Sequence, residues 1–395
     1  TMEVLFDNEK SENAKKISRY LDSMNSGMVD FYPTYIQLEH TNRCNAQCIM
    51  CNHSYIGNNG AQDVSEEVIQ KIKDIFPYCQ IIMLNGDGEP FLCKNIEQYL
   101  KLYRQYGVRV GTNTNLCGIN TSLLNNIGEY IDYLNISCDG CTKEVFEGIR
   151  KGLSFDHFIE NLRILNSVAP NLRKNLDCVI MTQNILQAVD LVIFAAEYGF
   201  ASIKFNMLGV NPCIGNERDS LIHYPNVAAS SLKLATEEAE RLGIDIVIPG
   251  IFNKAVDENR LALELDEIKK YDWSTVDRRI MVSKSRFSSA SLTGDYLNQL
   301  VTLDSLTNDS ICAPEICQWA IERCYIDLAG NVSTCCYNVH HYMGNILEVE
   351  NFDEIWNGMT YQNFRMNMKN GVLPSWCKDC GYYWSKVKTN FAGVR

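Results

Sequence analysis

Short apolar runs alternate with amphipathic helical patterns between residues 34 and 250, and this alternation constrains the fold more than any other feature. The apolar runs are rich in β-branched residues, which is typical of strands. They occupy residues 34–40, 80–86, 108–115, 133–140, 176–182 and 202–208. Helical patterns of about three turns separate them, for example over residues 65–76 and 155–168. Six such units predict right-handed βαβ connections and a parallel sheet, because parallel strands need a crossover connection.

The predicted fold class is α/β, with a partial (βα)6 parallel barrel and a small C-terminal α+β domain. A seventh helix and strand are predicted over residues 230–250, and a less regular, more polar stretch follows them. Cysteines return from Cys312 onward. We therefore expect a helical lead-in, the barrel, a connecting segment and the C-terminal domain at residues 1–33, 34–250, 251–311 and 312–395.

The charge balance argues against two classes of partner. The formal net charge is -12 and the pI is about 5.1, so the basic surface that nucleic acid or an anionic membrane would require is missing. No apolar run approaches the roughly 20 residues of a membrane span, and the N-terminus lacks the apolar core of a signal peptide. We expect a soluble cytoplasmic protein with no nucleic-acid or membrane partner.

Cysteine usage indicates metal ligation rather than disulfides, because the predicted compartment is reducing. Of the 17 cysteines, seven are scattered among predicted strands and helices, where free cysteine usually packs as a small apolar residue. These seven are Cys79, Cys93, Cys117, Cys138, Cys141, Cys178 and Cys213. The other ten fall into two groups, at residues 44–51 and 312–380.

The first group is the loop CNAQCIMC, directly after the first predicted strand. It places Cys44, Cys48 and Cys51 within eight positions. Three ligands leave one coordination position of a metal or cluster open, which a catalytic centre needs and a structural centre avoids. The alternative is a structural site with a distant fourth ligand, or three buried thiols.

Polar residues follow the predicted strands, as in GDGEP (86–90), TNTN (112–115) and SCDG (137–140). In parallel α/β folds the carboxyl ends of the strands form one rim, and the active site is built there. The alternative for any single loop is that Gly, Asn and Asp only form turns.

The cysteine loop, GDGEP and the βα series together resemble the radical S-adenosylmethionine (SAM) superfamily. The resemblance implies that Cys44, Cys48 and Cys51 hold a 4Fe-4S cluster whose fourth iron is chelated by SAM. It also implies reductive cleavage of SAM to a 5′-deoxyadenosyl radical that abstracts a substrate hydrogen atom. An external electron donor of the flavodoxin or ferredoxin type would then be a partner.

The same resemblance assigns the SAM contacts. Gly88, Glu89 and Pro90 would bind the amino group, and Asp87 stands where many members have glycine. Polar positions after the next strands match contacts to the ribose and carboxylate of SAM. Arg150 would offer a bidentate fork to that carboxylate, and Met50 would lie near the adenine. These positions are Asn113, Asn115, Ser137, Asp139, Arg150 and Met50. The alternatives are caps, turns and ordinary packing. No general base or other catalytic residue is identified.

The second group resembles the SPASM/twitch extension of some radical SAM enzymes. Cys317, Cys335, Cys377 and Cys380 would bind one auxiliary 4Fe-4S cluster, and YIDLAGNVSTC (325–335) predicts a β-hairpin with a Gly-Asn turn. Cys312, Cys324 and Cys336 are alternative ligands, and a structural zinc site is the alternative centre.

A fully ligated auxiliary cluster favours electron transfer, so the preferred function is a radical SAM oxidoreductase. We expect a small polar substrate, such as a sugar, aminocyclitol or nucleoside, because only about thirty residues precede the first strand and leave no room for a peptide-binding domain. The alternatives are modification of a peptide or protein side chain, of the maturase or thioether-forming type, and epimerisation with a cysteine hydrogen donor. The donor candidates are Cys117, Cys138, Cys141 and Cys213. A non-catalytic iron-sulfur electron carrier ranks last.

Overall fold

A ten-stranded sheet forms the framework of the computed structural model, which describes residues 2–56, 60–210, 216–273, 300–302, 316–336, 341–374 and 377. The strand order is β13-β12-β11-β1-β3-β4-β5-β7-β8-β9, and the strands from β11 to β9 are all parallel. These parallel strands are β11 (Arg323–Ile326), β1 (Tyr35–Leu38), β3 (Ile81–Met83), β4 (Arg109–Thr114), β5 (Tyr133–Ser137), β7 (Arg173–Ile180), β8 (Ser202–Met207) and β9 (Asp245–Val247).

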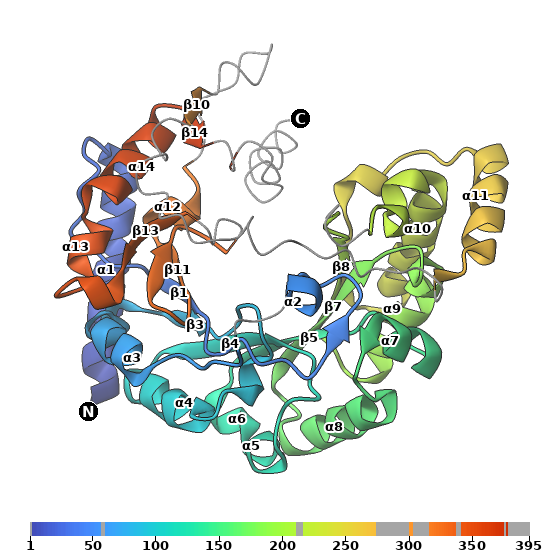
Figure 1. Cartoon of the computed structure of the whole chain (residues 1–395), viewed down its shortest axis with the longest axis horizontal. Helices are drawn as coiled ribbons and strands as arrows, with labels where there is room; N and C mark the ends of the chain where they lie inside the picture. Colours follow the sequence, from blue (N-terminus) through green and yellow to red (C-terminus); the bar gives the residue numbers. More distant parts are fainter. Residues whose placement is uncertain are drawn as a thin grey trace.

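The sheet curves into an open arc, with helices on its outer side (Figure 1). The helices that follow the strands are α3 (Glu66–Ile72), α4 (Ile96–Gln105), α5 (Thr121–Asn125), α6 (Ile127–Tyr130), α7 (Lys143–Ile149), α8 (Phe155–Val168), α9 (Ala188–Glu197), α10 (Pro225–Leu242) and α11 (Glu258–Lys270). Among the strands that the structure describes, the sheet is not closed, because β13 and β9 lie at opposite ends of the strand order. The predicted partial barrel is confirmed.

Alternation along each strand separates the two faces of the sheet. On the outer face Ile36, Ile82 and Leu134 are fully buried against the helices. Helix α8 illustrates the packing: Ser154 caps its N-terminus by accepting from the His157 amide, and Phe158 and other apolar residues on one side are buried. The inner face is left for polar residues.

A ladder of amides crosses this inner face at one level. Asn135 Nδ2 donates to Asn113 Oδ1 (2.9 Å), Asn175 Nδ2 donates to Asn135 Oδ1 (3.0 Å), and Ser202 Oγ donates to Asn175 Oδ1 (3.0 Å). These residues are paired in register across β4, β5, β7 and β8. Each of these polar side chains therefore finds a hydrogen-bond partner in its neighbour, below the rim of the sheet.

The C-terminal region adds strands to the same sheet. β11 pairs in parallel with β1, and it forms an antiparallel hairpin with β12 (Asn331–Ser333), which is followed by β13 (Tyr342–Asn345). Gly330 occupies the turn with a φ of +85°, a backbone conformation that favours glycine. The predicted hairpin is confirmed. Its continuity with the barrel sheet was not predicted.

The remaining elements of this region are α12 (Gln318–Ile321), α13 (Asp353–Trp356), α14 (Met359–Lys369) and β14 (Val372–Pro374). β14 pairs with β10 (Leu300–Thr302), so the predicted connecting segment contributes a strand to the C-terminal domain. Together these elements form the small α+β domain expected there.

The N-terminal segment packs against the C-terminal domain and forms hydrogen bonds with it. Helix α1 (Met2–Ser23) lies behind α13 and α14 in Figure 1, and the segment after it contacts both of these helices. Arg365 is fully buried on α14, where it donates to the carbonyls of Gly27 (2.9 Å) and Trp356 (2.8 Å). Its guanidinium also lies 4.4 Å from the centroid of the Trp356 ring.

Within the described ranges, no helix combines the length and apolar character that a transmembrane span requires.

Candidate active site

The middle of the cysteine loop is paired with a distant segment of the chain. The loop covers residues 44–51 and follows β1 after a short connecting segment. Its middle strand β2 (Gln47–Cys48) pairs with β6 (Arg150–Lys151). This pairing sets Cys48 opposite Arg150, and the Ile49 amide donates to the Ile149 carbonyl (3.0 Å). The loop is therefore tied to the chain that follows α7.

The three thiols share one largely buried environment. Cys48 is 8 % exposed, and Cys44 and Cys51 are half-buried. Burial raises the pKa of Cys48 to about 12 and also raises the pKa values of Cys44 and Cys51, while the positive charge of Arg150 acts in the opposite direction on all three. The thiol of Cys48 lies 3.9 Å from Arg150 Nη1. Over the described residues, no three Cys, His, Asp or Glu side chains are already grouped as a metal-binding set.

The donor set nevertheless fits an iron-sulfur cluster. Three cysteines from one short loop supply soft ligands that lose their protons on binding iron, and a neighbouring cation offsets the negative charge that results. Arg150 is placed to do this. The chemistry of these side chains matches the three-ligand centre expected from the spacing.

Arg150 is itself oriented by a buried partner. Its Nη2 lies 2.7 Å from Asp139 Oδ2, and Asp139 Oδ1 accepts from the Val179 amide (2.7 Å). Asp139 is fully buried, so its carboxylate holds the arginine in place. Arg150 Nε is buried and has no hydrogen-bond partner among the described atoms. A buried donor without a partner is costly, and an anionic ligand at this point would satisfy it.

The side chain of Glu89 is engaged within the protein. It is 3 % exposed, and its carboxylate accepts from Thr114 Oγ1 (2.6 Å) and from the Asn115 amide (2.7 Å). Burial raises its pKa to about 7. Pro90 is buried at the start of a short 3-10 helix, Pro90–Leu92. Glu89 thus joins the loop after β3 to the end of β4.

Gly88 is required by close packing. A Cβ at this position would overlap the backbone of residues 41–43, and the next residue, Glu89, donates its amide to the Arg43 carbonyl (2.7 Å). The GDGEP loop therefore lies directly against the chain that enters the cysteine loop.

The predicted asparagine and serine contacts occupy two different levels. Asn115 is buried above the end of β4, and its Nδ2 donates to Oδ1 of Asn45 inside the cysteine loop (2.8 Å). Asn113 lies lower, at the end of the amide ladder. Ser137 is half-buried at the carboxyl end of β5. Asn115 is the member of this set that touches the cysteine loop.

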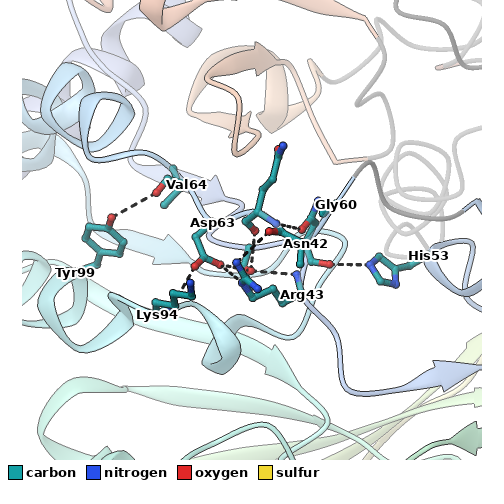
Figure 2. Close-up of polar contacts among 11 residues, drawn as sticks. Asn42, Arg43, His53, Gly60, Asp63, Val64, Lys94 and Tyr99 are labelled. Atoms are coloured by element: carbon teal, nitrogen blue, oxygen red, sulfur yellow. Dashed lines mark hydrogen bonds and ion pairs between the residues drawn. The ribbon is translucent and has the colours of Figure 1, made fainter.

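The entry to the cysteine loop is held by Asp63, which the sequence reasoning did not single out (Figure 2). Asp63 Oδ1 accepts from Thr41 Oγ1 (2.6 Å) and from Arg43 Nε (3.0 Å). The loop exit is joined to its entry, because His53 Nε2 lies 2.7 Å from the Asn42 carbonyl. Nothing in the sequence marks Asp63, because its partners lie about twenty positions away in the chain.

A hollow lies beside the cysteine loop. It is lined by Met50, Asn52, Val179, Met207, Leu208, Gly209 and Val210. Met50 is where the sequence analysis expects the adenine, but the residues from the ends of β7 and β8 were missed. The sequence did contain a signal for them, because MLGV (207–210) is an apolar segment at a strand end where the other strands are followed by polar residues.

The cysteines of the C-terminal region are partly described. Cys317 precedes α12, Cys335 and Cys336 follow β12, and Cys377 follows β14; all four are half-buried. Cys324 is fully buried on β11, in register with Ile36, and belongs to the apolar core. Two further predicted or alternative ligands, Cys380 and Cys312, lie outside the described residues.

Comparison with protein families now bears on this geometry. Residues 38–210 match the radical SAM superfamily, and residues 317–381 match the SPASM iron-sulfur cluster-binding domain. The chain is a radical SAM protein with a SPASM domain. The family resemblance noted in the sequence is confirmed, and the radical SAM match runs from the last residue of β1 through β8.

Relatives and solved structures agree with this assignment. The mycofactocin maturase MftC of Mycobacterium tuberculosis is 24% identical over 360 residues, which is 89% of this chain and 76% of that protein. Streptococcus suis SuiB bound to the precursor peptide SuiA superimposes with a TM-score of 0.57 at 15% identity, over 93% of this chain and 75% of that one. anSMEcpe with bound AdoMet gives a TM-score of 0.57 at 17% identity, over 89% and 84%. At these identities the structural likeness establishes the fold.

The two domains define the cofactors. They are SAM with a 4Fe-4S cluster for the radical SAM domain, and an auxiliary 4Fe-4S cluster for the SPASM domain, as predicted. When bound, SAM and its cluster supply one-electron chemistry that ends in abstraction of a hydrogen atom from the substrate. The chain is thus a radical SAM enzyme.

Proposed function

We propose that this radical SAM enzyme modifies a side chain of a peptide or protein. The supporting observation is the match to a maturase over most of the chain, including both the barrel and the SPASM domain. The structure of SuiB bound to its precursor peptide, which shares the fold, adds to it. The comparisons favour this alternative over the small polar substrate preferred in the sequence analysis.

The earlier preference depended on the length of the segment before β1. That length does not determine where a peptide binds, because the inner face of an open barrel is accessible without an additional domain. The half-buried amides of the inner-face ladder use only part of their hydrogen-bonding capacity on one another, and the remaining donors and acceptors suit hydrogen bonding to a peptide backbone.

For the cofactor sites, we assign Cys44, Cys48 and Cys51 to the SAM-binding cluster, and Cys317, Cys335, Cys377 and Cys380 to the auxiliary cluster. The Nε of Arg150 would donate to the SAM carboxylate, and the hollow beside Met50 would receive the adenine. The backbone of Gly88 to Pro90 would bind the amino group. Asp139, Glu89 and Asn115 then orient these groups, since their own polar atoms are engaged within the protein.

The proposed outcome is oxidation of the side chain. Removal of one hydrogen atom followed by transfer of one electron to the auxiliary cluster would leave the substrate two hydrogens lighter once a proton is also lost. An external donor of the flavodoxin or ferredoxin type would supply the electron that starts each turnover.

A test separates the two substrate classes. The reconstituted enzyme is incubated anaerobically with SAM and reductant, together with either the peptide fraction or the small-metabolite fraction of the source cells. We expect formation of 5′-deoxyadenosine to rise above the substrate-free rate with the peptide fraction alone, with a peptide product two hydrogens lighter. A rise with the metabolite fraction alone would reject the peptide assignment.

Radical epimerisation is a second candidate, and one observation bears on its hydrogen donor. Cys138 is fully buried, Cys141 lines an outer hollow beside α8 and α9, and Cys213 lies outside the described residues. Cys117 is half-buried at the rim, and its amide donates to Asn115 Oδ1 (2.8 Å). Epimerisation predicts an isomer of unchanged mass whose formation is lost in Cys117→Ala.

A further inference from the structure

A single buried carboxylate connects the two domains of this enzyme. Glu39 follows β1 and is 4 % exposed. Its Oε1 accepts from the amide of Asp87 (2.8 Å), in the GDGEP loop, and its Oε2 accepts from the amide of Leu328 (3.3 Å), after β11. One side chain therefore contacts the rim of the barrel and the hairpin of the SPASM domain.

The contact with the GDGEP loop is close. A Cβ at Gly86 would overlap the side chain of Glu39, so glycine is needed for the loop to approach this residue. Farther along the loop, Glu89 donates its amide to the Arg43 carbonyl (2.7 Å). The loop is consequently held at its start by Glu39 and at its end by the entry to the cysteine loop.

The contact with the hairpin is equally specific. The Glu39 amide donates to the Ile326 carbonyl (2.9 Å), which continues the pairing of β1 with β11. The Asp327 carboxylate caps the turn by accepting from the amides of Ala329 and Asn331 (2.9 Å each). The turn is thus fixed in a conformation that presents the Leu328 amide to Glu39.

The surroundings of Glu39 make these two amides important. The charged groups acting on it are the carboxylates of Asp87 and Asp327, which repel it. Tyr325 and Tyr342 also lie near enough to interact with it. The two amide hydrogen bonds therefore favour the ionised form, against burial and both neighbouring carboxylates.

We propose that Glu39 is a positioning residue that couples the SAM-binding loop to the SPASM domain, so that bound SAM and the docked β11–β12 hairpin stabilise each other. The inference depends on the proposed role of residues 88–90 in binding SAM. Coupling of this kind is reciprocal. If bound SAM stabilises the docked hairpin by a given factor, the docked hairpin raises the affinity for SAM by the same factor.

Glu39→Gln is the decisive variant, because it keeps the shape of the side chain but has one acceptor oxygen. The second amide would face an NH2 group instead of an oxygen. Glu67→Gln, on the exposed side of α3, makes the same change of charge away from the site and serves as the control. Glu39→Asp keeps the charge with a shorter reach, and it provides a second variant if Glu39→Gln does not fold.

Hydrogen–deuterium exchange and equilibrium binding of SAM are measured on the reconstituted enzyme at a pH where Glu39 is ionised. In the wild type and in Glu67→Gln, SAM is expected to slow exchange both in residues 86–90 and in the hairpin. In Glu39→Gln, the effect of SAM on the hairpin is expected to disappear, and SAM affinity to fall about fivefold. Glu39→Asp should give an intermediate result.

The failures are distinguishable. If the wild type does not bind SAM, the proposed function is rejected and the inference with it. If SAM binds but protects the hairpin equally in the wild type and Glu39→Gln, only the coupling is rejected. If hairpin exchange in Glu39→Gln rises by the same factor with and without SAM, Glu39 is structural and the coupling is again rejected.

Discussion

The two cysteine groups differ in how their ligands are brought together. The barrel cysteines lie within eight positions of one loop, and the loop is held by contacts with β6 and with Asn115 at the end of β4. The SPASM cysteines are assigned over residues 317–380, and the three that are described lie next to three different elements, α12, β12 and β14. The ligands of the first centre are therefore brought together by the sequence of one loop, whereas those of the second are brought together by the fold of a whole domain.

This difference predicts a clean separation of function between the two centres. Replacing Cys44, Cys48 and Cys51 with alanine should reduce iron from about eight to about four per chain, because the auxiliary 4Fe-4S cluster does not need this loop. Formation of 5′-deoxyadenosine should fall to background. Iron analysis and chromatography of the nucleoside measure both effects, and Cys141→Ala, which changes a cysteine outside the site, is the control.

The reverse experiment addresses the SPASM domain. Replacing Cys335 and Cys377 with alanine should also remove about four irons, yet SAM cleavage should persist because the barrel centre is intact. Substrate oxidation should be lost. Simultaneous loss of SAM cleavage and all iron would mean that the two centres do not assemble independently.

A substitution at Arg365 tests how strongly the auxiliary cluster depends on the folding of the SPASM domain. Its guanidinium is buried against Trp356 and satisfies carbonyls from both ends of the chain, so Arg365→Met should destabilise the SPASM domain by about 3 kcal/mol. We expect faster hydrogen exchange in α13 and α14 and preferential loss of the auxiliary cluster. Lys369→Ala, exposed on the same helix, should change neither quantity.

Arg150 tests the geometry of the first centre. Arg150→Lys keeps the charge but loses the planar fork, so SAM affinity should fall roughly tenfold while iron content stays near that of the wild type. Arg163→Lys on the exposed face of α8 is the matched control. Unchanged SAM affinity in Arg150→Lys would remove this residue from the SAM site.

The smallest expected effect is a pH dependence at the contact between the two domains. Burial raises the pKa of Glu39 from 4.5 to about 7, so the folded protein retains a proton that the unfolded chain releases. This contribution to stability is complete below the ordinary pKa and is lost as the pH rises through 7. Relative to Glu39→Gln, the wild type should therefore lose stability between about pH 4.5 and about pH 7, where the unfolded chain has released the proton and the folded protein still retains it, and the difference should level off above this range. Denaturant unfolding of both proteins over this pH range measures the difference in their free energies of unfolding. If the wild type became more stable relative to Glu39→Gln as the pH rises, the raised pKa of Glu39 would be contradicted.

Local patterns were sufficient to predict part of this molecule. The alternation of strand and helix patterns predicts the parallel strands from β1 to β9, and the eight-residue spacing predicts the three-cysteine loop. The turn at Gly330 is likewise a local feature, because a glycine with positive φ is what such a turn needs.

The features that were missed are contacts between residues distant in the chain. Tyr35 of β1 pairs with Arg323 of β11, and no local pattern reveals that two such strands are neighbours. The same applies to Glu39, which reads in the sequence as an acidic residue after a strand but contacts two loops in the structure. Residue types near the rim could be listed from the sequence, but which of them face a ligand and which hold another residue could not.

The central claim is that the three-cysteine loop performs SAM chemistry on a peptide. The most direct measurement is the reductant-dependent formation of 5′-deoxyadenosine by the fully iron-loaded enzyme, with and without the peptide fraction of the source cells. We expect 5′-deoxyadenosine to form, the peptide fraction to stimulate its formation, and replacement of Cys44, Cys48 and Cys51 to abolish it. An enzyme that carries both clusters but forms no 5′-deoxyadenosine under either condition would contradict it.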